Sequence, residues 1–197
     1  MAAFASIVTV EDFNEYMREE VKPEDDKLLD FKQRLILRCV PAIEKYTGLL
    51  MQTSNFSETF DGNGEAGLWL TYRPINSITS VTSNGSIVAA TEYYIKSKIN
   101  FLRFKNALVS GFQNYVIVYS AGYGYTNGVT ANNVPQPLRD ACLRWTAYNY
   151  KKANDRRHGV SAISAGDQSV TYFEKGMPED VAELLNPFVI PLARATN

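Results

Sequence analysis

The sequence has few cysteines and histidines, no excess of either charge and no long hydrophobic run. Two Cys and one His among 197 residues leave little for zinc or thiol chemistry. The 20 basic and 21 acidic residues almost cancel, whereas a dedicated nucleic-acid binder is usually basic overall. No stretch approaches the ~20 apolar residues that span a bilayer, and residues 1–10 do not resemble a signal peptide. We therefore expect a protein without a metal, a cofactor or a membrane contact.

The rest of the composition is that of a globular protein. Hydrophobic residues make up 45% of the chain and charged residues 21%, and both values are ordinary for a folded domain. The length fits one domain, or one domain with an insertion. The aromatic share is 12%, mostly Tyr and Phe. Because these residues fall in expected strands and on expected helix faces, they favour β packing and assembly surfaces over a ligand site.

Residues 1–52 carry a helical pattern. Thr9 and Asp12 stand at capping-box spacing before the apolar side of a first helix. A second helix is expected from near Glu24, because an acidic first turn suits the helix dipole and apolar residues follow at steps of three and four. Pro41 lies inside this pattern and predicts a kink or a split of the second helix.

Residues 53–129 change to the shorter period of β-strands. The expected strands are 56–60, 68–72, 75–81, 87–89, 93–95, 101–104 and 115–119. Asn84-Gly85 is the strongest short hairpin signal among them. We expect a meander in which tight turns join pairs of strands.

Residues 130–197 return to helix. In order, the pattern predicts a helix from Pro135 to about Arg156, a loop of small residues at 159–166, an extended segment at 168–173 and a last helix from Pro178 to Asn186. The predicted fold class is α+β. It consists of a bundle of about four helices, formed by residues 1–52 and 130–197, with an antiparallel β module of residues 53–129 inserted between them.

Three features that suggest chemistry have simpler structural explanations. Gly62–Gly67 satisfies G-x-G-x-x-G, but a strand run follows it, so a hairpin loop explains the motif better than a dinucleotide site. Cys39 and Cys142 lie beside apolar neighbours, which favours two buried thiols in a reducing compartment. His158 lies at the polar end of an expected helix, where a solvated side chain is the simpler interpretation.

Charge is distributed unevenly although its sum is small. Residues 1–30 contain nine acidic and three basic residues, a net charge of −6. Residues 139–157 contain six basic and two acidic residues, a net charge of +4. Two solvated helix faces would explain these runs. Contact between neighbouring copies, or with a partner, is the alternative.

Four stretches resemble, in order, the head-tail connector proteins of tailed bacteriophages, a family also called adaptor or head-completion proteins. The stretches are Ile43–Gly48, then Leu70–Val81 with its Arg-Pro-Ile-Asn-Ser-Ile-Thr-Ser-Val sequence, then Val134–Pro135 leading into Leu138–Leu143 and Tyr150, and last Ser169–Tyr172 followed by Met177–Val181 and Leu184–Leu185. The chain is longer than the compact members of this family, because residues 83–129 form a β extension.

The resemblance implies a structural virion protein without catalysis, made in the bacterial cytoplasm and placed in the neck. Such proteins form a ring, commonly of twelve copies, beneath the portal protein, and they offer a platform to the next neck or tail protein. DNA is expected to pass through the channel of the ring without specific binding. A ring of identical subunits needs a heterologous interface that closes.

Two groups of residues are candidates for these contacts. The candidate subunit-interface residues are Glu24, Asp25, Asp26, Arg139, Arg144, Lys151, Lys152, Arg156 and Arg157. The candidate portal-docking residues are Phe188, Val189, Ile190, Pro191 and Leu192, an apolar run that could become ordered on binding.

Two other functions stay open. One is a neck stopper or tail-completion protein, which would join the neck rather than the portal. The other is a small ligand-binding module or hydrolase, for which Glu58 and Asp61 would be the candidate carboxylates. A protein that lines a DNA channel should not grip DNA, so the near-neutral charge favours the connector.

Overall fold

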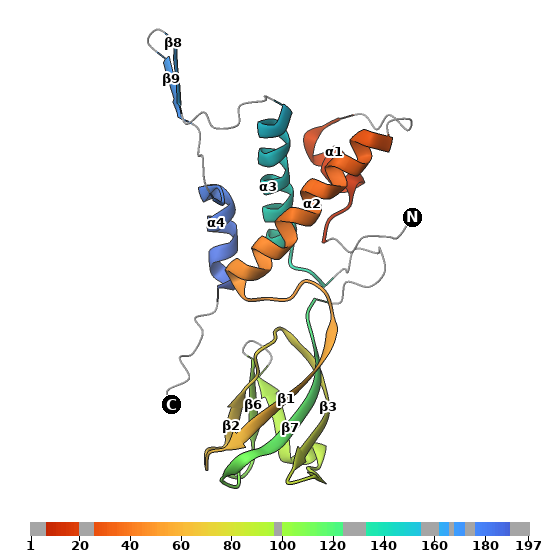
Figure 1. Ribbon diagram of the computed structural model, residues 1–197, viewed down its shortest axis with the longest axis vertical. Helices are drawn as coiled ribbons and strands as arrows, with labels where there is room; N and C mark the ends of the chain where they lie inside the picture. Colours follow the sequence, from red (N-terminus) through yellow and green to blue (C-terminus); the bar gives the residue numbers. More distant parts are fainter. Residues whose placement is uncertain are drawn as a thin grey trace. The chain divides into compact units, whose positions relative to one another are not determined.

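The computed structural model describes residues 7–19, 26–96, 100–123, 133–154, 162–165, 168–171 and 176–189. The chain divides into a unit of helices and a unit of strands (Figure 1). Of the described residues, the helical unit takes in those up to Thr47 and from Val134 to Val189, and the β unit takes in those between them. The predicted α+β class is confirmed.

The first helix, α1 (Val10–Met17), begins at the predicted cap. The Oγ1 of Thr9 accepts a hydrogen bond from Asp12 N at 3.0 Å, and Thr9 N donates to Asp12 Oδ2 at 2.8 Å. These bonds satisfy N–H groups at the start of the helix, which have no partner within the helix itself.

The second helix, α2 (Asp26–Thr47), continues through Pro41, so the predicted split does not occur. Proline removes one hydrogen-bond donor and crowds the carbonyl four residues before it. Buried apolar residues on both sides of Pro41 outweigh this local cost, because they fix the two halves of α2 in one core. They are Leu35, Ile36, Cys39 and Ile43.

The bundle is completed by α3 (Gln136–Asn154) and α4 (Glu179–Leu185), which a short 3-10 helix, η2 (Asn186–Phe188), extends. Each of the other three helices contacts α3. Phe13 of α1 meets Tyr150 of α3 edge to face, with ring centroids 5.6 Å apart. α2 also contacts the other three helices, so α2 and α3 together form the centre of the unit. No helix in the described part of the chain is long and apolar enough to cross a membrane.

Between α3 and α4 the structure has a small hairpin of β8 (Ala162–Ala165) and β9 (Gln168–Thr171). The extended segment predicted at 168–173 is thus confirmed for its first four residues, and residues 172 and 173 lie outside the described part. The loop predicted at 159–166 is corrected, because it contains β8.

Both cysteines are buried thiols, as predicted. The Sγ of Cys39 accepts hydrogen bonds from Thr146 Oγ1 and Asn149 Nδ2, each at 3.6 Å. Burial raises the pKa of the Cys39 thiol, and it raises the pKa of the Cys142 thiol well above its ordinary value. Both thiols are therefore protonated at neutral pH.

We expect neither cysteine to react readily with a disulfide reagent such as DTNB in the folded protein. The thiolate is the reactive form of cysteine. Burial lowers the fraction of thiolate and keeps the reagent away from the sulfur, so labelling at pH 8 should be at least about 100-fold slower than in guanidinium chloride. The comparison of native and unfolded chain measures this directly. Labelling of either cysteine at the unfolded rate would contradict the burial of that helix face.

The β unit consists of two antiparallel sheets. The four-stranded sheet has the order β1-β7-β3-β4, and the three-stranded sheet has the order β2-β6-β5. The strands are β1 (Ser54–Gly62), β2 (Gly67–Trp69), β3 (Ile75–Ser83), β4 (Ser86–Ile87), β5 (Tyr93–Lys96), β6 (Phe101–Phe104) and β7 (Gly111–Ala121), with a 3-10 turn, η1 (Ala90–Glu92), before β5. Since β7 lies between β1 and β3, the predicted meander is wrong for the larger sheet.

One of two predicted hairpins is present. Asn84 and Gly85 join β3 to β4 with φ values of 49° and 79°, as a type I′ turn requires. The hairpin predicted at Gly62–Gly67 is wrong, because β1 pairs with β7 and β2 pairs with β6. That loop connects the two sheets, and a strand follows it, so it presents no helix N-terminus to a phosphate.

The two sheets share one core. Buried residues reach it from the larger sheet and from the smaller one, among them Val81, Tyr115, Ile117, Tyr119, Leu68, Leu102 and Phe104. The rings of Phe104 and Tyr115 lie 5.9 Å apart, centroid to centroid. Because side chains alternate along a strand, the second face of each sheet points away from this core.

Candidate assembly surfaces

The structure describes only some of the candidate contact residues. Of the subunit-interface candidates it describes Asp26, Arg139, Arg144, Lys151 and Lys152, and Glu24, Asp25, Arg156 and Arg157 lie outside the described residues. Of the portal-docking candidates it describes Phe188 and Val189, and Ile190, Pro191 and Leu192 lie outside.

Two of the basic candidates have acidic partners within the chain. Arg139 Nη2 lies 3.4 Å from Asp12 Oδ2, the same carboxylate that caps α1. Arg144 Nη1 lies 3.5 Å from Asp180 Oδ2 in the first turn of α4. Partly exposed pairs of this kind contribute about 0–1 kcal/mol each. Their effect is geometric, because they join α3 to the helices on either side of it.

The other described candidates lie at helix ends. Lys151 and Lys152 are in the last turn of α3, where cations interact favourably with the helix dipole. Asp26 stands exposed in the first turn of α2, where an acidic residue is favoured for the same reason. Among the residues that the structure describes, none of these three side chains forms an ion pair.

The candidate docking segment leaves the helical unit from an anchored turn. The Oη of Tyr46 donates a hydrogen bond to Asn186 Oδ1 at 2.7 Å, which ties the start of η2 to α2. Phe188 is half-buried at the end of η2, and Val189 is 40% exposed. The apolar side chain of Val189 thus faces outward where the described part of the segment ends.

The two carboxylates considered for catalysis both hold the β unit together. Glu58 Oε2 accepts hydrogen bonds from Tyr119 Oη at 2.8 Å and from Thr71 N at 3.1 Å. Burial raises the pKa of the Tyr119 hydroxyl far above its ordinary value, and Glu58 adds to this shift. Asp61 Oδ1 accepts from Gln113 N at 2.6 Å. Among the described side chains, no group of three or more His, Cys, Asp or Glu could hold a metal ion.

Three exposed apolar residues of the β unit were not predicted from the sequence. They are Ile87 and Phe112, each 81% exposed, and Val109, 61% exposed. Phe112 lies near the end of the larger sheet that carries the β3–β4 turn, since Asn84 N donates to Asn114 O there. The side chain of Asn114 stiffens this end, because it accepts from Gly62 N at 2.7 Å and donates to Val109 O at 2.9 Å. Gln113 has φ 47°, an unusual conformation for glutamine that the sequence does not indicate.

Comparisons with known proteins match most of the chain. A family model described as "HCP: Head completion protein" matches residues 6–189. No curated protein matches the chain. A chain in the neck of an empty GTA particle, computed with C6 symmetry, has a TM-score of 0.59 at 17% identity, over 95% of this chain and 92% of that one.

Two further solved chains are similar. One comes from the neck of a native GTA particle computed with C12 symmetry, with a TM-score of 0.54 at 17% identity over 91% of this chain and 86% of the other. The second comes from the virion of a native gene transfer agent (GTA) particle, with a TM-score of 0.52 at 18% identity over 92% and 89%. At these identities the likeness is one of fold, and it includes both units.

Proposed function

The chain belongs to the head completion protein family, and we propose that it forms a ring beneath the portal, connects the capsid to the tail and extends the DNA channel. The observation that carries this proposal is the similarity of nearly the whole fold to chains from necks with C6 and C12 symmetry. A closed ring of identical subunits produces symmetry of this kind. The role is structural, its place is the virion neck after synthesis in the bacterial cytoplasm, and it requires no catalytic group.

The subunit interface would join unlike charges. In this proposal the acidic residues Glu24–Asp26 of one copy meet Lys151 and Lys152, with Arg156 and Arg157, of the next. The described members of both groups support it, because they are exposed or half-exposed at helix ends. Arg139 and Arg144 belong to the same proposed basic side, and each also has an acidic partner in its own chain that holds α3 in place.

The apolar segment from Phe188 to Leu192 would dock on the portal. Its support is the outward exposure of Val189 directly after a turn that Tyr46 and Asn186 anchor. Burial of apolar surface of this kind is the dominant favourable contribution to most protein–protein association.

The test is to mix the purified chain with portal rings of the same particle and to examine the mixture by electron microscopy. We expect a second ring stacked on the portal. Stacking on a different neck ring, with none on the portal, would replace the connector by a stopper or tail-completion protein. A monomeric chain in free solution is compatible with the proposal, because the portal can serve as the template of the ring.

The same experiment tests the docking segment through a double variant, Val189→Asp with Leu192→Asp. Because an apolar pocket disfavours a charge, the double variant should bind the portal at least about tenfold more weakly. The measurement is the fraction of portals that carry a second ring. Ile87→Asp with Val109→Asp is the matched control, since it places the same two charges on apolar side chains of the β unit that are 81% and 61% exposed. Equal stacking by the double variant and the wild type would show that another surface meets the portal.

A further inference from the structure

The outward face of the β2-β6-β5 sheet carries aromatic and basic residues together, and we call it the aromatic–basic face. Register partners form two rows across the sheet. The rows are Trp69 and Phe101, then Gly67, Arg103 and Tyr94. Residues two apart on a strand share a face, so both rows lie on one side of the sheet. The intervening residues Leu68, Leu102 and Ile95 point into the core.

The rings on this face are held by the sheet and remain open to solvent. Trp69 is 48% exposed and Tyr94 is 49% exposed. The rings of Trp69 and Phe101 lie 4.7 Å apart, centroid to centroid. Gly67 makes room for this pair, because a Cβ at that position would lie 2.1 Å from Phe101 Cζ. Large aromatic side chains are thus left uncovered in a unit that fully buries Tyr119.

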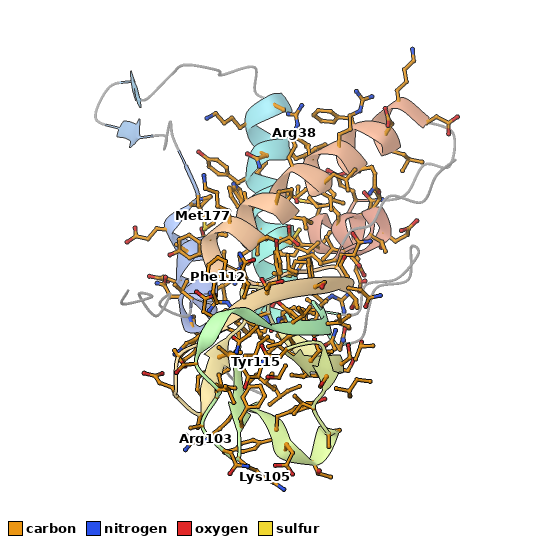
Figure 2. The ribbon with its side chains drawn as sticks, turned by 60° about the horizontal axis from the view of Figure 1, so that its bottom comes forward. Arg38, Arg103, Lys105, Phe112, Tyr115 and Met177 are labelled. Carbon is orange, nitrogen blue, oxygen red and sulfur yellow. The ribbon has the colours of Figure 1, made fainter. Side chains whose placement is uncertain are left out.

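Positive charge accompanies these rings. Residues 93–105 contain four basic residues and no acidic one. The side chains of Arg103 and Lys105 are exposed, and within the described part of the chain neither is joined to a carboxylate. Figure 2 shows both projecting from the surface of the β unit. Glu92 lies beside Lys105, but its carboxylate accepts a hydrogen bond from Asn106 Nδ2 at 3.5 Å.

We propose that the aromatic–basic face binds single-stranded DNA without sequence preference. Unpaired bases stack on Trp69 and Tyr94, and phosphates lie against Arg103 and Lys105. Exposed aromatic side chains on a sheet, flanked by Arg and Lys, hold unpaired bases in many unrelated proteins. The observations favour a single strand over a duplex, because the faces of paired bases are covered by their neighbours. Binding is weak and sensitive to salt, since the chain as a whole has a net charge of −1.

The test is a titration of a fluorescein-labelled oligothymidine with the full chain, followed by fluorescence anisotropy at low salt. Trp69→Ala and Tyr94→Ala should each weaken binding by about tenfold, the loss of one stacked base. The Arg103→Ala, Lys105→Ala double variant should lower the slope of log K against log salt by about 1.4, or about 0.7 for each phosphate contact. Phe112→Ala is the matched control, because it removes an aromatic ring that is 81% exposed elsewhere in the same unit.

Trp69→Phe is a conservative variant to compare with Trp69→Ala. It keeps a stacking ring, so it should retain most of the affinity for the oligothymidine. A duplex of the same length should bind less tightly than the single strand. The proposal is overturned if the wild type does not bind, if Trp69→Ala and Tyr94→Ala bind as the wild type does, or if the duplex binds equally well. The titration uses no portal and no ring, so its failure leaves the connector role untouched and the failure of stacking leaves this proposal untouched.

Discussion

Replacing Gly122 by alanine should destabilise the β unit by about 3 kcal/mol or more, one of the largest effects expected of a single methyl group in this chain. Gly122 has φ 113°, a conformation that side chains disfavour. A Cβ at this position would lie 2.1 Å from the carbonyl oxygen of Gln52 and 2.7 Å from its carbon. Both atoms belong to the backbone, so no side-chain rotation relieves the overlap.

The backbone near Gly122 cannot move away because three segments of the β unit are joined there. Gly122 N donates to Pro74 O at 2.8 Å, and Tyr123 N donates to Leu50 O at 2.9 Å. Gly122 O accepts from Asn76 Nδ2 at 2.7 Å. The segment that enters the β unit thus lies against the segment that leaves it. A shift at this point would break several hydrogen bonds at once.

Gly85→Ala is the matched control for this prediction. Gly85 also has a positive φ, 79°, but nothing lies within 4 Å of a Cβ placed there. It should therefore cost only the backbone strain, about 1–2 kcal/mol. Differential scanning calorimetry measures both variants, because it resolves separate transitions when two units unfold independently. Equal losses for the two variants would contradict the close contact at Gly122.

Replacing Lys32 by methionine should destabilise the helical unit by about 2–4 kcal/mol. Lys32 Nζ donates to Asn14 Oδ1 at 2.6 Å and lies 2.7 Å from Glu19 Oε2. It also lies over two aromatic rings, 5.8 Å from the centroid of Phe13 and 5.4 Å from that of Tyr150. The Lys32 side chain is only 5% exposed. One ammonium group therefore connects α1, α2 and α3.

The cost arises mainly from the groups that Lys32 would leave behind. Asn14 is 3% exposed and would lose the partner of its buried carbonyl oxygen. Glu19 is 34% exposed, so water would replace part of its lost interaction. Methionine keeps the volume of the side chain, which separates the loss of the ammonium from the creation of a cavity.

The control lies on the same helix. Arg34 pairs with Asp30 one turn away, but their side chains are 65% and 54% exposed. Arg34→Met should therefore change the stability by no more than about 0.5 kcal/mol. Guanidinium chloride unfolding, followed by circular dichroism of the helices, compares the two variants. A Lys32→Met protein as stable as Arg34→Met would mean that the buried network contributes nothing.

Features determined by neighbouring residues could be predicted from the sequence. The cap at Thr9 and Asp12 and the turn at Asn84-Gly85 depend only on residues within a few positions. The course of α2 through Pro41 could not be predicted. The burial of the apolar face of α2 outweighs the local cost of the proline, and this face packs on residues of α3 that are distant in the sequence. The place of β7 between β1 and β3 depends likewise on pairing between residues 32 to 67 positions apart, which no local pattern specifies.

Among the candidate contact residues, too, local features could be predicted and contacts between distant residues could not. The sequence located the basic run, but not the partners of Arg139 and Arg144, which are Asp12 and Asp180 from other helices. The aromatic content was interpreted as β packing and assembly surface, and buried residues such as Tyr119 show the packing. Tyr94 is 49% exposed, and its side of the sheet could not be predicted, because the register decides which face of a strand meets the core.

The central position of β7 also determines when the chain can fold during synthesis. β1 and β3 leave the ribosome before β7, but they do not pair with each other. They can join one sheet only when β7, which lies between them, has been made. We expect the larger sheet to form only after residue 121 has emerged, as one late and cooperative event. α1 and α2 wait longer still, since α3 follows the whole β unit along the chain. The β unit can thus be complete while the first two helices still lack the helix on which they pack.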